Sequence, residues 1–449
     1  MTQLNFLYTQ NQLQNIAEDI INKSLQMGAT SAQVELSESI STDLEVLNQR
    51  IETLETSHEN QLLLTVFKGH RKGNVGISSI KTTNLTTIIQ QALDIATYTE
   101  EDLDNGLLEP EYLANKTDKN LSLYNPYNIT NDDLIKQTCE LESLAADSSL
   151  IKASDGASTS LTYYNFVTAN SNGFNDGYQT SRFSRYVSLI GENHAGMQTD
   201  YWYTSARDFN DLENNHQIAE LAQQRILRRL NRGEIKSSKP KIIFETQIAK
   251  SIIGSLMGAL SGNSQYRKLS FLNDSLGTKI MPEWLSISED PFIIKGLASC
   301  YFDNECGRVT SSNIIENGNV AKYLLSSYSA RKLGMTPTGN AGGTHNLLIS
   351  NNFDGNLASL AKEMDHGIII IETIGHGLNM VTGDYSVGAS GLLVKSGIIC
   401  EYVDNLTISG NMKTIFNNIA LIANDYNNGS ILCGSMLINE GVIQVSSAS

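Results

Sequence analysis

Apolar residues recur every three or four positions in four segments of the first half of the chain. These segments are residues 11–27, 85–97, 132–146 and 215–232. This spacing places the apolar side chains on one face of an α-helix, so we predict four amphipathic helices. Gly28 follows the first segment and fits the position after a helix end, while Asn131 precedes the third and fits an N-cap.

The end of the fourth predicted helix is rich in arginine. The arginines in this region are Arg225, Arg228, Arg229 and Arg232, and Gly233 follows them. Positive side chains near the end of a helix complement the partial negative charge of its dipole. We therefore interpret these arginines as a local stabilising feature of the helix.

Short apolar runs near glycines predict strands in the rest of the first half. Residues 32–36 and 62–67 fit two strands, with tight turns at Gly69 and Gly73. Residues 151–209 consist of short runs rich in Tyr, Thr, Val and Ser, interrupted by the turn sequences NSNG and NDG. This pattern is typical of an antiparallel meander.

A polar segment at residues 233–240, GEIKSSKP, contains one of only six prolines and marks a predicted boundary. A chain of 449 residues exceeds the size at which a single core usually stops growing. We therefore predict two domains, residues 1–236 and residues 237–449, joined by a short hinge.

The second half is rich in glycine and shows short elements of both kinds. The elements that we predict are strands at 241–244, 367–371 and 391–394 and helices at 246–260 and near 412–423. Strands and helices do not alternate regularly, which favours an α+β fold over a doubly wound sheet. The expected architecture is an N-terminal domain of helices with an antiparallel sheet and a Gly-rich, β-rich C-terminal domain with a few helices.

Composition narrows the possible partners and location. The net charge of -16 argues against direct binding of duplex DNA, which draws on clustered Lys and Arg. The first residues lack a basic and apolar leader, and no apolar run approaches the roughly 20 residues that span a bilayer. The five cysteines contain no CxxC pair and indicate reduced thiols. We therefore expect a cytoplasmic protein without a membrane partner.

Residues 326–346, SSYSARKLGMTPTGNAGGTHN, form the most distinctive block of the chain. Together with seven further blocks, it matches one protein family in both order and spacing. The seven blocks are 262–270, 274–277, 296–299, 362–364, 381–390, 408–411 and 433–435. Through these blocks the chain resembles the PmbA/TldE branch of the TldD/TldE family, also called modulators of DNA gyrase. The resemblance covers nearly the whole chain. It implies one subunit of a heterodimeric metalloprotease of bacteria and archaea.

The resemblance also implies that the catalytic zinc motif, HExxxH, belongs to a TldD-like partner. The corresponding helix here, residues 251–264, contains no His, Glu, Asp or Cys, and the two histidine positions fall near Ile253 and Gly258. Hydrolytic zinc needs several such ligands. Cys433 lies where the TldD branch has a cysteine ligand, and we interpret it as a buried core residue or as the relic of a metal site. We therefore expect no cofactor in this chain and zinc in the partner.

Five other residues have metal-binding side chains that could form an atypical site. They are His345, Asp365, His366, Glu372 and His376. None shows the helical spacing of a ligand pair. The Gly-rich segment 383–391 lacks the GxxxxGK[ST] framework of a phosphate loop, so we interpret it as a structural turn. No GxSxG elbow or Ser/His/Asp set suggests a nucleophile.

The resemblance implies a closed dimer around a channel that admits only unstructured peptides. We expect the blocks 326–346 and 383–391 to line that channel or the subunit interface. The candidate residues are Ser326, Tyr328, Arg331, Lys332, Asn340, Gly342, Gly343, His345, Asn346, Gly383, Asp384, Tyr385 and Ser386. Arg331 and Lys332 are expected to be solvated or paired across the interface. Glycine-rich strand edges suit an extended peptide that binds through its backbone.

Three functions therefore remain open. The first is a noncatalytic subunit that helps to cleave unstructured peptides in peptide maturation, leader removal and antitoxin turnover. The second is an autonomous metallopeptidase with an atypical site, and the third is a peptide-binding regulatory protein without a proteolytic role. The link to gyrase is expected to be indirect, through peptide toxins. A homodimer in isolation would use the surface offered to the partner.

Overall fold

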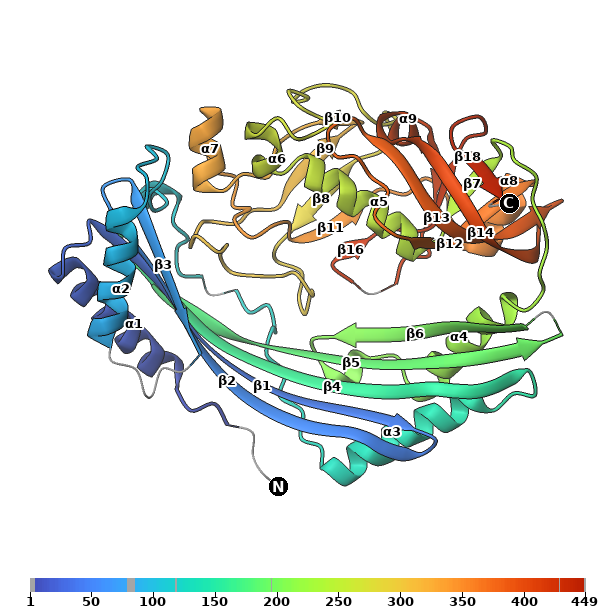
Figure 1. Ribbon diagram of the computed structural model, residues 1–449, viewed down its shortest axis with the longest axis horizontal. Coiled ribbons are helices and arrows are strands. Elements are labelled where there is room, and N and C mark those ends of the chain that lie inside the picture. The colour runs from blue at the N-terminus through green and yellow to red at the C-terminus, as the bar shows by residue number, and fades with distance from the viewer. Residues whose placement is uncertain (1–4, 79–84, 118, 195, 428, 448–449) are drawn as a thin grey trace.

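A computed structural model describes residues 5–78, 85–117, 119–194, 196–427 and 429–447. An antiparallel six-stranded sheet dominates the first half, in the order β3-β2-β1-β4-β5-β6. Its strands are β1 (Ser31–Leu47), β2 (Arg50–Lys68), β3 (Arg71–Ile77), β4 (Ile151–Asn170), β5 (Asn175–Asn193) and β6 (Gly196–Ala206). Figure 1 shows these long strands curving beneath the second half of the molecule.

The antiparallel meander predicted for residues 151–209 is confirmed, but the strands are much longer than the predicted ones. β1 spans 17 residues and β2 spans 19, whereas the predicted strands covered 32–36 and 62–67. In the parts of β1 and β2 that the sequence did not predict, the side chains on the face without helices are polar. These parts therefore lack the continuous apolar run that marks a strand buried on both faces. Gly73 was predicted in a turn and lies inside β3, opposite Val66.

All four predicted helices of the first half are confirmed. They are α1 (Gln10–Gln26), α2 (Leu85–Tyr98), α3 (Asn131–Ala146) and α4 (Asn215–Arg228), and short 3-10 turns lie at Pro110–Tyr112 and Phe209–Asp211. The predicted N-cap of α3 was wrong by one residue. The hydroxyl of Thr130 accepts the backbone N–H of Asp133 at 3.1 Å, and Asn131 is the first helical residue.

The helices cover one face of the sheet. Val34 and Leu36 of β1 pack against α1 and α2, while Ile40 and Leu44 of the same strand belong to the cluster under α3 and α4. The side chains between them in β1 are polar, because successive residues of a strand point to opposite faces. The sheet therefore has one apolar, helix-covered face and one polar face.

Two sheets form the second half. One contains β7 (Lys241–Phe244), β12 (Gly367–Ile374), β13 (Asp384–Lys395), β14 (Ile398–Asn411), β15 (Ile419–Ile422), β17 (Met436–Ile438) and β18 (Gln444–Ser447). The other contains β8 (Ile287–Asp290), β9 (Ser312–Glu316), β10 (Asn319–Val320), β11 (Asn346–Ile349) and β16 (Ile431–Leu432). Only β7–β12 and β11–β16 pair in parallel among the described strands. The α+β prediction is confirmed.

The helices of the second half are short, apart from the one that follows β7. They are α5 (Thr246–Ala259), α6 (Gly262–Tyr266), α7 (Ser327–Leu333), α8 (Leu357–Met364) and α9 (Met412–Asn417). Ile252, Ile253 and Leu256 of α5 are almost completely buried in a cluster that contains residues of both sheets. The helix α5 is therefore central to this core.

Two predictions for the second half were wrong in detail. The helix near 412–423 ends at Asn417, because residues 419–422 form β15 and pair with β17 at the sheet edge. The segment 383–391, interpreted as a turn, belongs largely to β13, which runs from Asp384 to Lys395 between β12 and β14. Tertiary strand pairing outweighs the local signals of Gly383 and Gly388 here.

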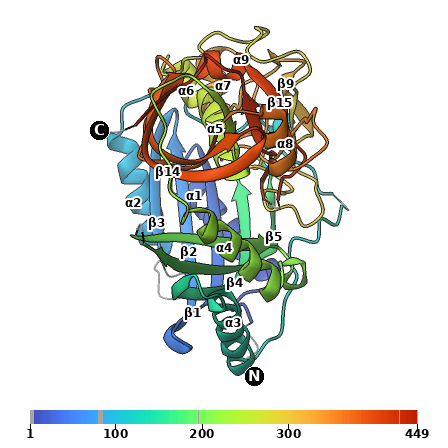
Figure 2. The same cartoon turned by 90° about the vertical axis from the view of Figure 1, so that its right-hand side faces the viewer.

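The segment that follows α4 is held against the second half. Arg232 forms a bridge with Tyr402, and Ser238 forms one with Val445. In Figure 2, α4 runs across the long sheet and its end comes close to the second half. Among the described helices, none combines the length and apolar character that crossing a bilayer requires.

Candidate functional site

A cavity of about 250 Å³ lies where the polar face of the long sheet meets loops of the second half. The sheet contributes Glu35, Phe166, Thr168 and Tyr178. The loops contribute residues 298–300, 302–304 and 341–345. Three of the residues predicted from the sequence, Gly342, Gly343 and His345, therefore meet at one site.

The Gly-rich segment at this cavity requires its glycines. Gly342 and Gly343 adopt φ values of 102° and 124°, which L side chains rarely adopt. Gly339 has a φ of 72°, and a β-carbon on it would lie 2.4 Å from the carbonyl oxygen of Arg308. These glycines let the segment turn and approach neighbouring backbone closely.

Buried polar residues hold the segment in place. Asn340 donates from its amide to both carboxylate oxygens of Glu289, at 3.1 and 2.9 Å. Asn346 donates to the carbonyl of Asp290 and to the hydroxyl of Ser299, both at 2.8 Å. Asn340 and Asn346 therefore act as internal supports of the cavity wall.

Asp303 connects two walls of the cavity. Its carboxylate accepts backbone N–H groups from Glu305, Gly307 and Ala341, at 2.9, 2.7 and 3.1 Å. Burial raises the pKa of this carboxyl although these hydrogen bonds oppose the shift. Burial also raises the pKa of Glu35 on the opposite wall.

His345 and Cys300 form a hydrogen-bonded pair at the cavity. Their Nδ1 and Sγ atoms are 3.3 Å apart, and Nε2 of His345 lies 2.9 Å from the carbonyl oxygen of Gly339. Burial, with Asp303 and Glu289 nearby, raises the pKa of the Cys300 thiol to about 12. The sequence alone did not single out Cys300, because 45 residues separate it from His345.

The charged residues of α7 bind inside the chain. Arg331 donates to the Glu109 carboxylate at 2.9 and 3.0 Å and to the carbonyls of Asp104, Gly106 and Leu107. Lys332 contacts the carboxylates of Asp102 and Asp104, at 2.9 and 2.8 Å. The expectation that Arg331 and Lys332 are solvated or paired across an interface is therefore replaced by contacts within the chain.

The start of α7 serves the same anchoring. Ser326 is the N-cap of this helix and forms a capping box with Ser329. The hydroxyl of Tyr328 donates to Asp102 at 2.7 Å. Hydrogen bonds from Lys332 and Tyr328 lower the pKa of Asp102 to about 2. Ser326 and Tyr328 thus help to tie α7 to residues 102–109.

The second predicted block does not reach the cavity. Gly383 precedes β13, and Asp384 accepts hydrogen bonds from Asn411 and Thr382 at 3.0 and 2.8 Å. Tyr385 is buried, which raises its pKa to about 12, whereas Ser386 is exposed. The structure therefore separates 383–386 from Gly342, Gly343 and His345.

At the two positions where the sequence analysis placed the histidines of the zinc motif, the structure has no ligand side chain. Ile253 is completely buried in the core, and a β-carbon on Gly258 would have only the Met380 methyl within 4 Å. Burial raises the pKa of Cys433 to about 12, and its thiol donates to the carbonyl of Gly434 at 3.4 Å.

The other candidate ligands are dispersed. His366 is exposed beside Asp365, with Nδ1 2.9 Å from the carboxylate, and His376 is also exposed. Over the residues that the structure describes, no group of three His, Cys, Asp or Glu side chains is arranged to hold a metal ion.

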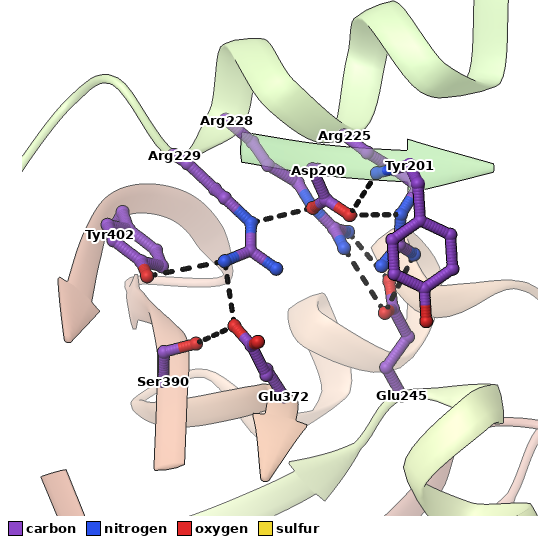
Figure 3. Close-up of polar contacts among 9 residues, drawn as sticks. All are labelled: Asp200, Tyr201, Arg225, Arg228, Arg229, Glu245, Glu372, Ser390 and Tyr402. Carbon is purple, nitrogen blue, oxygen red and sulfur yellow. Dashed lines mark hydrogen bonds and ion pairs between the residues drawn. The ribbon is translucent and has the colours of Figure 1, made fainter. Parts of the chain in front are cut away.

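A cluster of arginines and carboxylates joins the two halves, and the sequence did not predict it (Figure 3). Arg225 of α4 and Arg229, the C-cap residue of that helix, bind opposite oxygens of Asp200, at 3.1 and 2.6 Å. Arg225 and Arg228 bind Glu245, which precedes α5, at 3.2 and 2.6 Å. The interpretation of these arginines as partners of the helix dipole was therefore incomplete.

Glu372 extends the cluster into the second sheet. Arg229 donates to its carboxylate at 2.8 Å, and the hydroxyl of Ser390 donates to the same oxygen at 3.1 Å. The hydroxyl of Tyr402 lies 3.4 Å from Arg229 (Figure 3). Glu372, which was considered as a metal ligand, is thus engaged by an arginine.

Charge pairing outweighs burial in this cluster. Burial by itself raises the pKa of Asp200, but Arg225 and Arg229 leave it below the ordinary value. The same balance lowers the pKa of Glu245, through Arg228 and Arg225. Buried ionised groups require such pairing. The cluster therefore fixes α4 and the start of α5 against each other.

Comparisons with known proteins agree with this architecture. Models of the PmbA/TldA metallopeptidase match the chain in three parts: domain 1 at residues 32–96, the central domain at 124–230 and the C-terminal domain at 237–445. The family thus describes the first half by two models.

Individual relatives match over most of their length. The chain is 35% identical to the Metalloprotease PmbA of Escherichia coli O157:H7, over 95% of both chains. It is 36% identical to a Metalloprotease PmbA homolog of Haemophilus influenzae, over 91% of both.

Solved structures share the fold. A Bacteroides thetaiotaomicron structure, whose name refers to a modulator of DNA gyrase, covers 99% of this chain with a TM-score of 0.92 and 24% identity. TldE from Thermococcus kodakarensis covers 96% of this chain with a TM-score of 0.83 and 19% identity. From the family models and the identity to the PmbA relatives, we conclude that this chain belongs to the PmbA/TldD metallopeptidase family.

Proposed function

We propose that this chain is the noncatalytic subunit of a two-chain metallopeptidase that cleaves unstructured peptides. A TldD-like partner supplies the zinc ion and its HExxxH helix. The observation that supports the proposal is the helix α5, which the resemblance aligns with the zinc helix of TldD. It has Ile253 in the apolar core and no ligand side chain between residues 251 and 264. A catalytic zinc ion needs about three protein ligands and an open position.

The name of one structural relative supports the division of roles. TldE of Thermococcus kodakarensis shares the fold of this chain, and the resemblance of the sequence to the TldE branch implies a TldD partner. In this proposal the chain contributes binding surface instead of reacting groups. The relatives named Metalloprotease PmbA are consistent with participation in proteolysis.

The polar face of the long sheet suits an extended peptide. Along β1 it carries Gln33, Glu35, Ser39 and Ser41, and β4 adds Thr168, Tyr164 and Thr162 opposite Glu35, Ser39 and Ser41. Hydroxyl and amide side chains offer hydrogen bonds without selecting a single side-chain pattern. We propose that this face and the cavity at Gly342, Gly343 and His345 line the route of the peptide, and that Ser326, Arg331 and Lys332 support it from behind.

The proposal also covers the cellular compartment and the oligomeric state of the chain. The free cysteines fit a reducing compartment such as the cytoplasm. The chain alone forms at most a homodimer through the surface normally offered to its partner. Peptide maturation, leader removal and antitoxin turnover are the activities to which such an assembly contributes.

The test is cleavage of a disordered fluorogenic peptide by this chain alone, by a TldD-like partner alone and by their mixture. Each sample is measured with and without a zinc chelator, and a folded protein of similar length serves as the substrate control. We expect cleavage of the disordered peptide only in the mixture, with loss on chelation. Cleavage that zinc restores after chelation identifies the metal.

A variant of this chain separates the proposed division of roles from an atypical site. Cys433→Ala in the mixture is expected to leave the cleavage rate unchanged, because the thiol is buried and hydrogen-bonded to backbone. Chelator-sensitive cleavage by this chain alone contradicts the proposal and identifies an autonomous enzyme. Failure to bind a TldD-like chain, with no activity in the mixture, supports a regulatory peptide-binding protein instead.

A further inference from the structure

The pair formed by Cys300 and His345 has the arrangement of a thiol with a base. Sγ of Cys300 lies 3.3 Å from Nδ1 of His345. The other ring nitrogen, Nε2, lies 2.9 Å from the carbonyl oxygen of Gly339. A thiol, an imidazole within hydrogen-bond reach and a third group that orients the imidazole together form the pattern of an activated nucleophile.

The carbonyl of Gly339 determines which ring nitrogen carries the proton. A carbonyl oxygen only accepts hydrogen bonds, so Nε2 must be the N–H donor of the neutral imidazole. Nδ1 is then unprotonated and accepts the hydrogen of the Cys300 thiol. His345 is therefore oriented to take a proton from Cys300.

The cavity gives a ligand access to this pair. Cys300 is partly exposed and lines the cavity of about 250 Å³, whereas 7% of the His345 surface is exposed. This volume is slightly below the roughly 300–1,000 Å³ of typical ligand pockets, so only a small molecule fits. A small molecule therefore reaches the thiol from the cavity while the imidazole stays sheltered.

The cavity wall disfavours an anionic ligand. Its carboxylates belong to Glu35 and Asp303, and its described lining residues include no Lys or Arg. An anion would lack a cationic partner there, and a buried unpaired charge is strongly unfavourable. The thiol is a soft nucleophile that attacks carbon electrophiles.

We propose that Cys300 is a modification site at which the thiol adds to a small, uncharged α,β-unsaturated carbonyl compound, with His345 as the proton acceptor. Sγ forms a bond to the β-carbon, and the thiol proton passes to Nδ1 of His345. The electrons of the carbon–carbon double bond move toward the carbonyl, and the α-carbon then takes the proton from Nδ1. The reaction is an addition, in which nothing is oxidised or reduced and no group leaves.

The burial of Cys300 explains why the base is needed. Because burial keeps the thiol protonated at neutral pH, free thiolate is scarce and the attack depends on transfer of the proton during the reaction. Neither zinc nor a partner chain takes part in this reaction. The proposal can therefore be tested separately from the proposed function.

The test uses N-ethylmaleimide, which is an α,β-unsaturated carbonyl compound, on the native full-length chain. Peptide mapping by mass spectrometry follows the labelling of each cysteine with time. Cys139 and Cys400 are also partly exposed and serve as internal references, since neither makes a hydrogen bond to an imidazole in the described chain. We expect Cys300 to react at least about 10-fold faster than either reference, because general base catalysis contributes about 10²–10⁴-fold.

Two variants of His345 test its role. His345→Gln can keep a donor near the Gly339 carbonyl but removes the basic nitrogen, and we expect a drop of about 100-fold at Cys300 with unchanged rates at Cys139 and Cys400. In His345→Gly, added imidazole is expected to restore part of the lost rate. Equal rates in wild type and His345→Gln, or wild-type labelling of Cys300 no faster than of Cys139 and Cys400, overturn the proposal. The wild-type ranking decides the question if both variants unfold.

Discussion

Arg228 and Glu245 join the first half of the molecule to the helix at the centre of the second. Nη1 of Arg228, at the end of α4, lies 2.6 Å from Oε1 of Glu245. Glu245 occupies the N-cap position of α5 but makes no side-chain cap, because its carboxylate is turned toward Arg225 and Arg228. An ion pair between the two halves thus replaces a local helix cap.

We expect Glu245→Gln to lower the free energy of unfolding by about 3–5 kcal/mol, since it leaves the buried Arg225 and the partly buried Arg228 with fewer charged partners. Equilibrium unfolding in urea measures the change. Asp19→Asn is the control, because Asp19 pairs with Lys23 on the exposed surface of α1 and such pairs contribute about 1 kcal/mol or less. A loss at Glu245 no larger than at Asp19 would show that the cluster does not hold the halves together.

The same cluster makes stability depend on acid. The pKa of Asp200 and that of Glu245 are lowered in the folded chain. Their stabilising contribution is therefore complete above the unfolded pKa values of about 4 and is lost as the pH falls through the lower folded values. Asp200→Asn lacks one of these contributions, so the gap in unfolding free energy between it and wild type should narrow as the pH falls from 6 toward 3. Urea titrations at several pH values check this, and a gap that stays constant contradicts it.

Arg331→Lys should loosen residues 102–109. The guanidinium binds the Glu109 carboxylate and three backbone carbonyls, which a single ammonium group cannot reproduce. We expect a loss of about 1–3 kcal/mol and faster proteolytic cleavage within this segment. Arg308→Lys is the matched control. Arg308 also donates to a backbone carbonyl, that of Glu111 at 3.3 Å, so this variant shows the effect of the same replacement at another arginine. Equal cleavage rates in the two variants would count against an anchoring role.

Two glycines, one in α5 and one at the start of α6, should respond in opposite ways to alanine. A β-carbon on Gly254 in α5 meets no atom within 4 Å, so Gly254→Ala should raise the free energy of unfolding by about 0.5–1 kcal/mol through helix propensity. A β-carbon on Gly262 would lie 2.2 Å from the Ser329 hydroxyl, so Gly262→Ala should separate α6 from α7 and lower the melting temperature. Thermal unfolding of both variants tests the contrast, and a stabilised Gly262→Ala would refute the packing argument.

Local patterns in the sequence determined the elements whose residues are close along the chain. The apolar spacing of residues 11–27 and 85–97 predicts α1 and α2, because a helix forms from neighbours three and four positions apart. The absence of ligand residues between 251 and 264 is likewise a property of the sequence alone. The family blocks were also sufficient to identify the relatives.

The long strands and the end of α9 were decided by tertiary pairing. The polar parts of β1 resemble loop sequences. They form a strand because β2 and β4 pair with β1 and because helices cover the other face of the sheet. Residues 419–422 are apolar enough for a helix, and only the neighbouring β17 selects a strand for them. Such choices depend on which distant segment lies alongside.

Only the tertiary structure showed which distant polar residues contact each other. His345 meets a thiol 45 residues away, and Arg229 meets a carboxylate 143 residues away. Charge and hydrogen-bonding capacity can be read from the sequence, but a partner is defined by distance in space. The sequence thus determined the helices, the family and the lack of a zinc motif, whereas packing decided which polar groups face each other, because their energies depend on contact and burial.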